Sequence, residues 1–262
     1  MSVPMVTVLI LLVGGSAIRQ DEGPQKPGDS RADRPVLPGC EEESLITTCV
    51  EARRSFYAPR CDGGDLNACV AAGSAYASDI VDFGAAILAY GRACEGGIAE
   101  GCHGVGGIYG SPVIDRFYNP ELARPFLERA RELYAARCRV EEARACASLV
   151  DMLENGQVRE ATRGERKRLA KKTHMLLLAQ CRQGLASACG DLADFCVRQG
   201  REDDKCFLFG LQSACKLGDS KACWVMGWTY RRGARGVRSD AATASEYFAR
   251  ACEGGYRPAC GL

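Results

Sequence analysis

The sequence predicts an all-α protein, a solenoid of about five helix–turn–helix hairpins that stack one on the next. The first observation behind this prediction is a repeat of cysteine pairs whose members lie eight residues apart. The pairs recur every 33 to 44 residues, a period that is typical of helical-hairpin solenoids. They are Cys61/Cys69, Cys94/Cys102, Cys138/Cys146, Cys181/Cys189, Cys215/Cys223 and Cys252/Cys260.

The second observation is a helical pattern after the second cysteine of each pair, which we name helix A. The fourth residue after the cysteine is small in most units, as at Gly73, Gly106, Ala193 and Gly227, with Val150 as the exception. The seventh residue is usually Tyr or Leu. These positions share one face of a helix with the cysteine. We therefore expect the small residue to let a neighbouring helix approach closely.

A second helix, which we name helix B, is predicted before the first cysteine of each pair. A Tyr, Leu or Phe stands four residues before that cysteine, and Ala often stands eight before it, which makes a second apolar stripe. Asp240 is the expected N-cap of the last helix B. Asn119 and Pro120 indicate another helix start, which Pro125 is expected to kink or delay. Each unit is thus helix A, a turn, helix B and a cysteine-flanked loop.

The composition restricts the functions to consider. The chain has 262 residues and a net charge of +1, so it lacks the basic surface expected of a nucleic-acid-binding protein. Its 16 cysteines indicate metal sites in a reducing compartment or disulfides in an oxidising one.

The N-terminus favours the oxidising compartment. An apolar run over residues 3–13 is followed by Gly15, Ser16 and Ala17, which predicts a signal peptide over residues 1–17. Residues 18–39 mix Pro, Gly and charge, as a disordered linker does. We expect a secreted or periplasmic protein with no stable membrane anchor after cleavage. An uncleaved apolar tail on a cytosolic protein is the alternative.

The repeats resemble the Sel1-like repeat family, a relative of the tetratricopeptide repeats, and most of all its disulfide-rich branch, the Helicobacter cysteine-rich proteins. The resemblance covers about residues 45–262 and is carried by three segments: SACKLGDSKACWVMGWTYRRGARGVRSD at 213–240, ACEGGIAEGC at 93–102 and ACEGGYRPAC at 251–260. It implies a right-handed α-solenoid of Sel1-like repeats over residues 40–262, with the hairpins joined by disulfides.

In proteins of this branch the first cysteine ends helix B, the second begins the next helix A, and a disulfide closes the loop between them. The resemblance therefore implies six such bridges. Cys196 and Cys206 are expected to face each other inside one hairpin and form a seventh, and Cys40 and Cys49 pair by elimination. A redox-active pair would more usually be a C-x-x-C motif, which the sequence lacks. We expect no cofactor and no metal, since the cysteine spacing does not fit zinc and there are only two histidines.

No catalytic residue is predicted. His103 and His174 have no nearby nucleophile in the sequence and are interpreted as surface or packing histidines. Some members of the cysteine-rich branch are described as penicillin-binding proteins or weak β-lactamases, and Ser213 and Lys216 do match S-x-x-K. The sequence has no S-D-N and no K-T-G, so the match is interpreted as chance. A penicillin-binding or β-lactamase function remains the alternative to a binding scaffold.

The expected function is the noncatalytic binding of a protein or peptide on the concave face of the solenoid, lined by the A helices. The exposed aromatic and charged residues to test first are Trp224, Trp228, Tyr230, Arg231 and Arg232, although Trp228 and Tyr230 could serve packing alone. The basic stretch Arg159–Lys172 is interpreted as a solvated outer face, with an acidic partner as the alternative. A third hypothesis is a redox or assembly factor of the mitochondrial intermembrane space.

Overall fold

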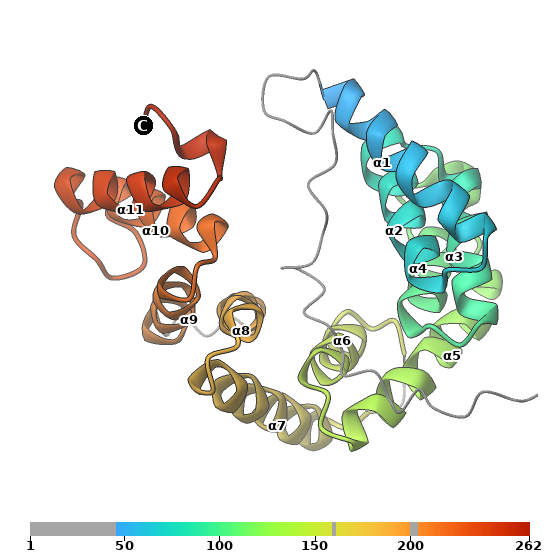
Figure 1. The fold of residues 1–262 in the computed structure, drawn as a ribbon. Coiled ribbons are helices and arrows are strands. Elements are labelled where there is room, and N and C mark those ends of the chain that lie inside the picture. Colours follow the sequence, from blue (N-terminus) through green and yellow to red (C-terminus); the bar gives the residue numbers. More distant parts are fainter. Residues whose placement is uncertain (1–45, 159–160, 200–203) are drawn as a thin grey trace, which may run out of the picture. The chain divides into compact units, whose positions relative to one another are not determined.

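A computed structural model describes residues 46–158, 161–199 and 204–262, without the side chains of residues 46–50, 79–80 and 204 (Figure 1). The signal peptide over residues 1–17, the linker over residues 18–39 and the Cys40–Cys49 bridge lie outside the described residues. These three expectations stay predictions.

The described residues form eleven α-helices and no strand. Five A/B hairpins are formed by α2 with α3, α4 with α5, α6 with α7, α8 with α9, and α10 with α11, and α1 stands before them in the place of a helix B. The helices are α1 (Ile46–Asp62), α2 (Leu66–Ala75), α3 (Phe83–Glu95), α4 (Ala99–Gly110), α5 (Pro120–Arg139), α6 (Ala143–Glu154), α7 (Arg163–Arg182), α8 (Ala186–Arg198), α9 (Asp204–Lys216), α10 (Ser220–Arg232) and α11 (Ala241–Glu253). Three single turns complete the set: η1 (Tyr76–Ile80), η2 (Asp115–Phe117) and η3 (Arg257–Ala259). The predicted hairpin repeat is confirmed.

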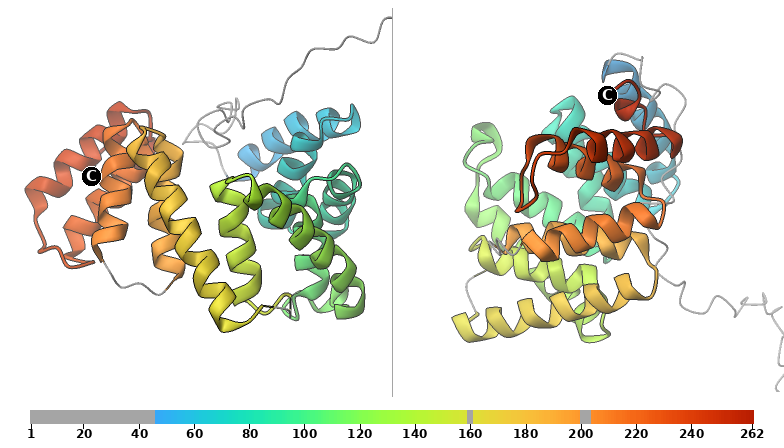
Figure 2. Two further views of the ribbon diagram at one scale, coloured as in Figure 1. Left: turned by 90° about the horizontal axis from the view of Figure 1, so that it is seen from below. Right: turned by 90° about the vertical axis from the view of Figure 1, so that its left-hand side faces the viewer.

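Each helix packs mainly on its neighbours in chain order, as Figures 1 and 2 show. The buried side chains accordingly form several separate clusters along the chain and not one central core. This is the packing of a solenoid, in which every repeat relies on the repeats beside it. The predicted fold class, an all-α solenoid of stacked hairpins, is confirmed.

The small residues of helix A lie where the helices approach closely. A Cβ atom added at Gly73 would stand 2.6 Å from the ring of Tyr90, and one added at Gly227 would stand 2.5 Å from the ring of Phe248. Tyr90 and Phe248 each lie four residues before the first cysteine of a pair. The two stripes predicted from the sequence therefore pack against each other, and glycine is needed because the aromatic ring occupies the space of a side chain.

Two predicted helix starts are also confirmed. The Asp240 carboxylate accepts from the backbone N–H of Ala242 at 3.0 Å and thereby caps α11. The Asn119 side chain accepts from Leu122 N–H at 3.1 Å, and α5 begins at Pro120. Pro125 lies inside α5 and does not delay its start.

Six disulfides join each helix B to the helix or turn after it, and we name them the joint bridges. They are the six pairs with a sequence separation of eight, and their Cα–Cα distances run from 4.5 to 5.0 Å. In five of the six connections the chain turns sharply at a glycine in the left-handed region, for example Gly97 with φ of 83° and Gly255 with φ of 87°. In the connection between Cys138 and Cys146 the residue at this place is Glu141, with φ of 65°. The repeated ACEGG segment is thus a helix end, a tight turn and one half of a bridge.

The second cysteine of a joint bridge lies deeper in its helix than expected. Our expectation that this cysteine begins helix A is wrong by three residues, because α2, α4, α6 and α8 each begin three residues before it. The reason is that the chain leaves the tight turn through one extended residue, the N-cap, and the helix starts directly after that residue. The cysteine therefore lies in the first helical turn and faces inward. The four cysteines concerned, each at most 1% exposed, are Cys69, Cys102, Cys146 and Cys189.

This burial limits what those four cysteines can do. A sulfur without accessible surface offers nothing to a binding partner and little to a thiol reductant, whose attack requires access. Cys69, Cys102, Cys146 and Cys189 are consequently structural residues of the joints and not parts of a surface site.

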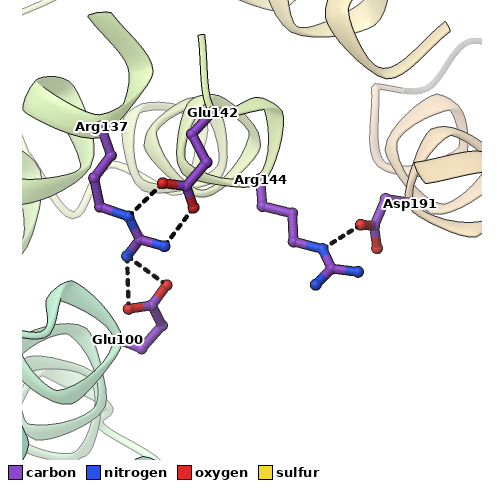
Figure 3. Close-up of polar contacts among 5 residues, drawn as sticks. All are labelled: Glu100, Arg137, Glu142, Arg144 and Asp191. Carbon is purple, nitrogen blue, oxygen red and sulfur yellow. Dashed lines mark hydrogen bonds and ion pairs between the residues drawn. The ribbon is translucent and has the colours of Figure 1, made fainter. Parts of the chain in front are cut away.

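Ion pairs connect successive hairpins on the surface (Figure 3). The Arg137 guanidinium at the end of α5 donates to Glu100 on α4 at 2.9 Å and also to Glu142, the residue before α6. Farther along the chain, Arg144 of helix α6 donates to Asp191 of helix α8, the A helix of the following hairpin.

The far ends of α6 and α8 are joined in the same way. Arg198 of α8 stands 3.2 Å from Asp151 of α6. Burial raises the pKa of the Asp151 carboxyl, and Arg198 opposes that shift. The two A helices α6 and α8 are thus joined by an ion pair at both ends.

Candidate functional site

Helix α10 carries all five residues that the sequence singled out for binding. Its first turn is capped by Asp219, whose carboxylate accepts from Ala222 N–H at 2.9 Å, and its C-cap is Gly233, where φ is 62°. The bridge from Cys215 to Cys223 fixes its start against α9. The helix therefore presents its side chains from a position that is held at both ends.

An aromatic cluster forms where α10 meets α11, and we define it as Trp224, Trp228, Phe248 and Tyr256. The ring of Trp224 stands edge-on to that of Trp228 with centroids 6.3 Å apart, and lies 5.4 Å from Tyr256. Trp228 lies 5.6 Å from Phe248. Trp224 and Trp228 are half-buried, so our expectation of exposed tryptophans is wrong. Their rings pack on the hairpin and leave one part of each accessible.

Two arginines from the last turn of α10 approach Trp228. The guanidinium carbon of Arg232 lies 4.8 Å from the centroid of the ring and that of Arg231 lies 5.1 Å from it. Both arginines are exposed. At these distances a guanidinium is attracted by the negative face of an indole. The result is a half-buried indole beside two solvated positive charges.

Tyr230 does not join this group. It stacks on Tyr247 of α11 with ring centroids 5.6 Å apart and planes only 12° from parallel. Burial raises the pKa of the Tyr247 hydroxyl. The structure thus brings together four of the five predicted binding residues and assigns the fifth to packing between α10 and α11.

The indole N–H groups of the two tryptophans are unusual because they are buried without a hydrogen-bond acceptor in the described part of the chain. Both Nε1 atoms are buried, and neither has an acceptor among the residues that the structure describes. A buried donor without an acceptor generally costs about 1–3 kcal/mol. Few native groups are left in this state, and each needs an explanation.

The other candidates from the sequence have ordinary roles or no support. His103 shares a hydrogen bond of 2.9 Å with Gln157 and contacts the edge of Tyr134, so it is a packing histidine. The S-x-x-K match at Ser213 and Lys216 encloses Cys215, which is bridged to Cys223, and Lys216 is exposed at the end of α9. Nothing in the described residues supports a β-lactamase site there.

The basic stretch lies on α7, with Arg159 and Glu160 outside the described residues. Arg163, Lys167 and Lys171 are exposed, as expected for a solvated face. Lys172 donates to the Cys138 carbonyl oxygen at 2.9 Å, so this side chain also satisfies a carbonyl group in the last turn of α5.

Sequence reasoning missed Phe248 and Tyr256 as members of the cluster. Phe248 had been assigned to the stripe of helix B, and Tyr256 lies in the cysteine-flanked loop ACEGGYRPAC. The aromatic residue in that loop is the one signal in the sequence that could have indicated it.

No helix in the described part of the chain is long and apolar enough to cross a membrane.

Three solved structures similar to this one are Sel1 repeat proteins or display that fold. A Sel1 repeat protein from Oxalobacter formigenes is 18% identical with a TM-score of 0.38, over 78% of this chain and 79% of that chain. A putative Sel1 repeat protein from Klebsiella pneumoniae is 16% identical with a TM-score of 0.39, over 79% of this chain and 95% of that chain. A protective antigen of uropathogenic Escherichia coli strains is 15% identical with a TM-score of 0.30, over 84% of this chain and 60% of that chain. No protein-family model and no curated protein matches the sequence.

Proposed function

We propose that this protein is an exported, noncatalytic Sel1-like scaffold that binds a protein or peptide partner through α10, at Trp224, Trp228, Arg231 and Arg232. The observation that carries the proposal is the combination at Trp228: a half-buried indole with an unsatisfied N–H, flanked by two exposed guanidinium groups. Trp and Arg are the residue types most enriched among the residues that dominate binding energy at protein interfaces.

The chemistry of the surface favours one kind of partner segment. The two guanidinium groups attract carboxylates, and the indole N–H groups need carbonyl or carboxylate oxygens as acceptors. Binding through these donors requires an indole to rotate so that its N–H reaches the surface, where a partner oxygen can accept it. The donors that are unsatisfied in the free protein then become satisfied in the complex. We therefore expect an acidic peptide segment.

Export is supported by the cysteines. Seven disulfides occur among the described residues, and none of the fourteen cysteines whose side chains are described is free. Disulfides in such number are typical of oxidising, extracytoplasmic compartments. The signal peptide expected at residues 1–17 agrees with this location.

The experiment uses the two tryptophans themselves as the probe. The chain has only two, and both lie in the aromatic cluster, so its intrinsic tryptophan fluorescence reports on this site alone. Peptides selected from a displayed random library against the oxidised full chain are titrated while that fluorescence is followed. We expect acidic peptides, and a loss of affinity of about tenfold or more in Arg231→Ala/Arg232→Ala, because two charged contacts are removed.

Arg238→Ala is the matched control, since Arg238 is an exposed arginine on the same hairpin. Its affinity for the selected peptides should equal that of the wild type. Peptides that bind without changing the fluorescence, or that bind the double variant and the wild type equally, would overturn the proposal for this surface.

A further inference from the structure

A second group of chemically active side chains lies away from α10, where three helices of two successive hairpins meet. Cys196 lies near the end of α8 and is fully buried, and Cys206 lies in the first turn of α9 and is half-buried. The two form the seventh disulfide. His174, in the middle of α7, directs its imidazole at this bridge, with Nδ1 3.9 Å from each sulfur.

This arrangement is specific to one bridge. In five of the joint bridges the second sulfur lies 3.6 to 3.7 Å from the carbonyl oxygen of the first cysteine. The first sulfur of one of them, Cys61, also lies 4.0 Å from the Arg92 guanidinium. Among the described residues, the sulfurs that contact an imidazole are those of Cys196 and Cys206. Across the described residues, His174, Cys196 and Cys206 are also the only group of three or more His, Cys, Asp or Glu side chains whose ligand atoms come together, all within 4.8 Å of one another.

The distances fit a shared metal ion. Zinc binds thiolate sulfur at about 2.3 Å and imidazole nitrogen at about 2.0–2.1 Å in tetrahedral geometry, which places nitrogen and sulfur ligands about 3.5–3.6 Å apart. The observed 3.9 Å from Nδ1 to each sulfur is close to that value. Only the two sulfurs must separate, and the Cα–Cα distance of 6.2 Å between these cysteines is wider than in any joint bridge.

We propose that, once the Cys196–Cys206 bridge is reduced, the two thiolates and the His174 imidazole bind one Zn²⁺ ion, with solvent in the fourth position. Two thiolates neutralise the charge of the ion, so the complex is neutral at a site that is partly shielded from water. The bridge and the zinc complex are then alternative states of the same three side chains.

The reductant that the change requires is a dithiol. One of its thiolates attacks Sγ of Cys206, which is half-buried while Cys196 is fully buried, and the S–S bond breaks with Cys196 leaving as a thiolate beside His174. The second thiol of the reductant resolves the mixed disulfide, which releases Cys206 and leaves the reductant as a disulfide. Two electrons pass from the dithiol to the pair, and Zn²⁺ displaces any protons that the two sulfurs hold.

The test begins with the full oxidised chain and a limiting amount of dithiol, so that only accessible bridges open. Two are expected to open: Cys196–Cys206 and Cys252–Cys260, whose Cys260 is exposed. Alkylation and peptide mass identify the opened pairs, and native mass spectrometry after addition of Zn²⁺ counts the bound ions. We expect one ion per chain. With Co²⁺ in place of Zn²⁺, we expect thiolate-to-cobalt absorption.

The variants distinguish this site from zinc bound by any pair of thiols. His174→Ala keeps both cysteines and is expected to weaken Zn²⁺ binding at least tenfold, and Cys196→Ser/Cys206→Ser to abolish it. His103→Ala is the matched control, because it removes the chain's other histidine and should leave binding unchanged. Cys252→Ser/Cys260→Ser should also leave binding unchanged.

The proposal is overturned if the chain reduced at Cys196–Cys206 binds no Zn²⁺, if His174→Ala binds as tightly as the wild type, or if the ion depends on Cys252 and Cys260. These readouts do not involve α10, so they are independent of the binding function proposed above.

Discussion

The joint bridges and the Cys196–Cys206 bridge are both disulfides, but they differ in their position within the repeat and in the groups beside them. Each joint bridge closes the connection between a helix B and the next helix or turn, and its cysteines have a sequence separation of eight. The Cys196–Cys206 bridge lies within one hairpin, has a separation of ten, and faces the imidazole of His174. Whether a disulfide can also take part in a reaction is therefore indicated by the side chains beside it, and not by the bond itself.

The difference results from where each pair is placed. The five joint bridges before Cys252–Cys260 are buried at the turn between two helices, and the second sulfur of each lies against the carbonyl oxygen of the first cysteine. The in-hairpin bridge lies between α8 and α9 at a point where α7 of the preceding hairpin also arrives. A third helix can contribute a side chain there.

Removing either kind of bridge tests whether both stabilise the fold alike. In the chain-entropy model a closed loop of eight residues contributes about 2.5 kcal/mol and one of ten residues about 2.7 kcal/mol. Cys138→Ala/Cys146→Ala and Cys196→Ala/Cys206→Ala should therefore lower the free energy of unfolding by nearly equal amounts, measured with urea on oxidised protein. A loss below about 1 kcal/mol for the joint bridge would mean that the hairpins do not need it.

Helix A and helix B of each hairpin pack closely but bury few large apolar side chains between them, which is why we expect the disulfides to be needed. Substitution of a glycine at this contact tests how close the packing is. Gly227→Ala should cost about 1–3 kcal/mol, because its new Cβ would lie 2.5 Å from the Phe248 ring. Gly107→Ala is the matched control: no atom lies within 4 Å of the added Cβ, and helix propensity favours alanine by about 0.5–1 kcal/mol. Thermal unfolding of both variants gives the sign of each effect. Equal effects would contradict the close helix approach.

The smallest effect is expected from the ion pairs that join hairpins without sulfur. The Arg144 and Asp191 side chains are 33% and 15% exposed, so Arg144→Ala should cost about 1 kcal/mol. The more exposed pair of Arg124 and Glu121 on α5 provides the control, and Arg124→Ala should cost less than about 0.5 kcal/mol. Urea unfolding at low and high salt measures both. A larger loss for Arg124→Ala would contradict the role given to Arg144.

Much of the fold could be predicted from sequence because its rules are local. A helix places residues four and seven positions apart on one face, so the stripes at Gly73 and Tyr90 could be found before their contact was seen. The regular cysteine spacing, with the family resemblance, indicated the joint bridges. The Cys196–Cys206 bridge was also predicted, since both cysteines stand near the turn of one hairpin.

The contacts of the candidate site could not be predicted, because they depend on the direction in which each side chain leaves its helix and on how successive hairpins pack. Tyr230 lies two positions after Trp228, about 200° around α10, and therefore contacts Tyr247 on another side of the helix. His174 lies 22 residues before Cys196 and in the preceding hairpin, so no spacing motif joins them. Our expectation that the sequence holds no metal site depended on such motifs, which do not detect side chains that come together from three helices.

The most direct test of the account is a peptide map of the purified, non-reduced chain by mass spectrometry. We expect crosslinked peptides that join the cysteines of each pair separated by eight residues, and one further crosslink between Cys196 and Cys206. Free thiols in the pairs separated by eight residues, or crosslinks between cysteines of hairpins that are not neighbours, would contradict the disulfide-joined solenoid and the exported location proposed for it.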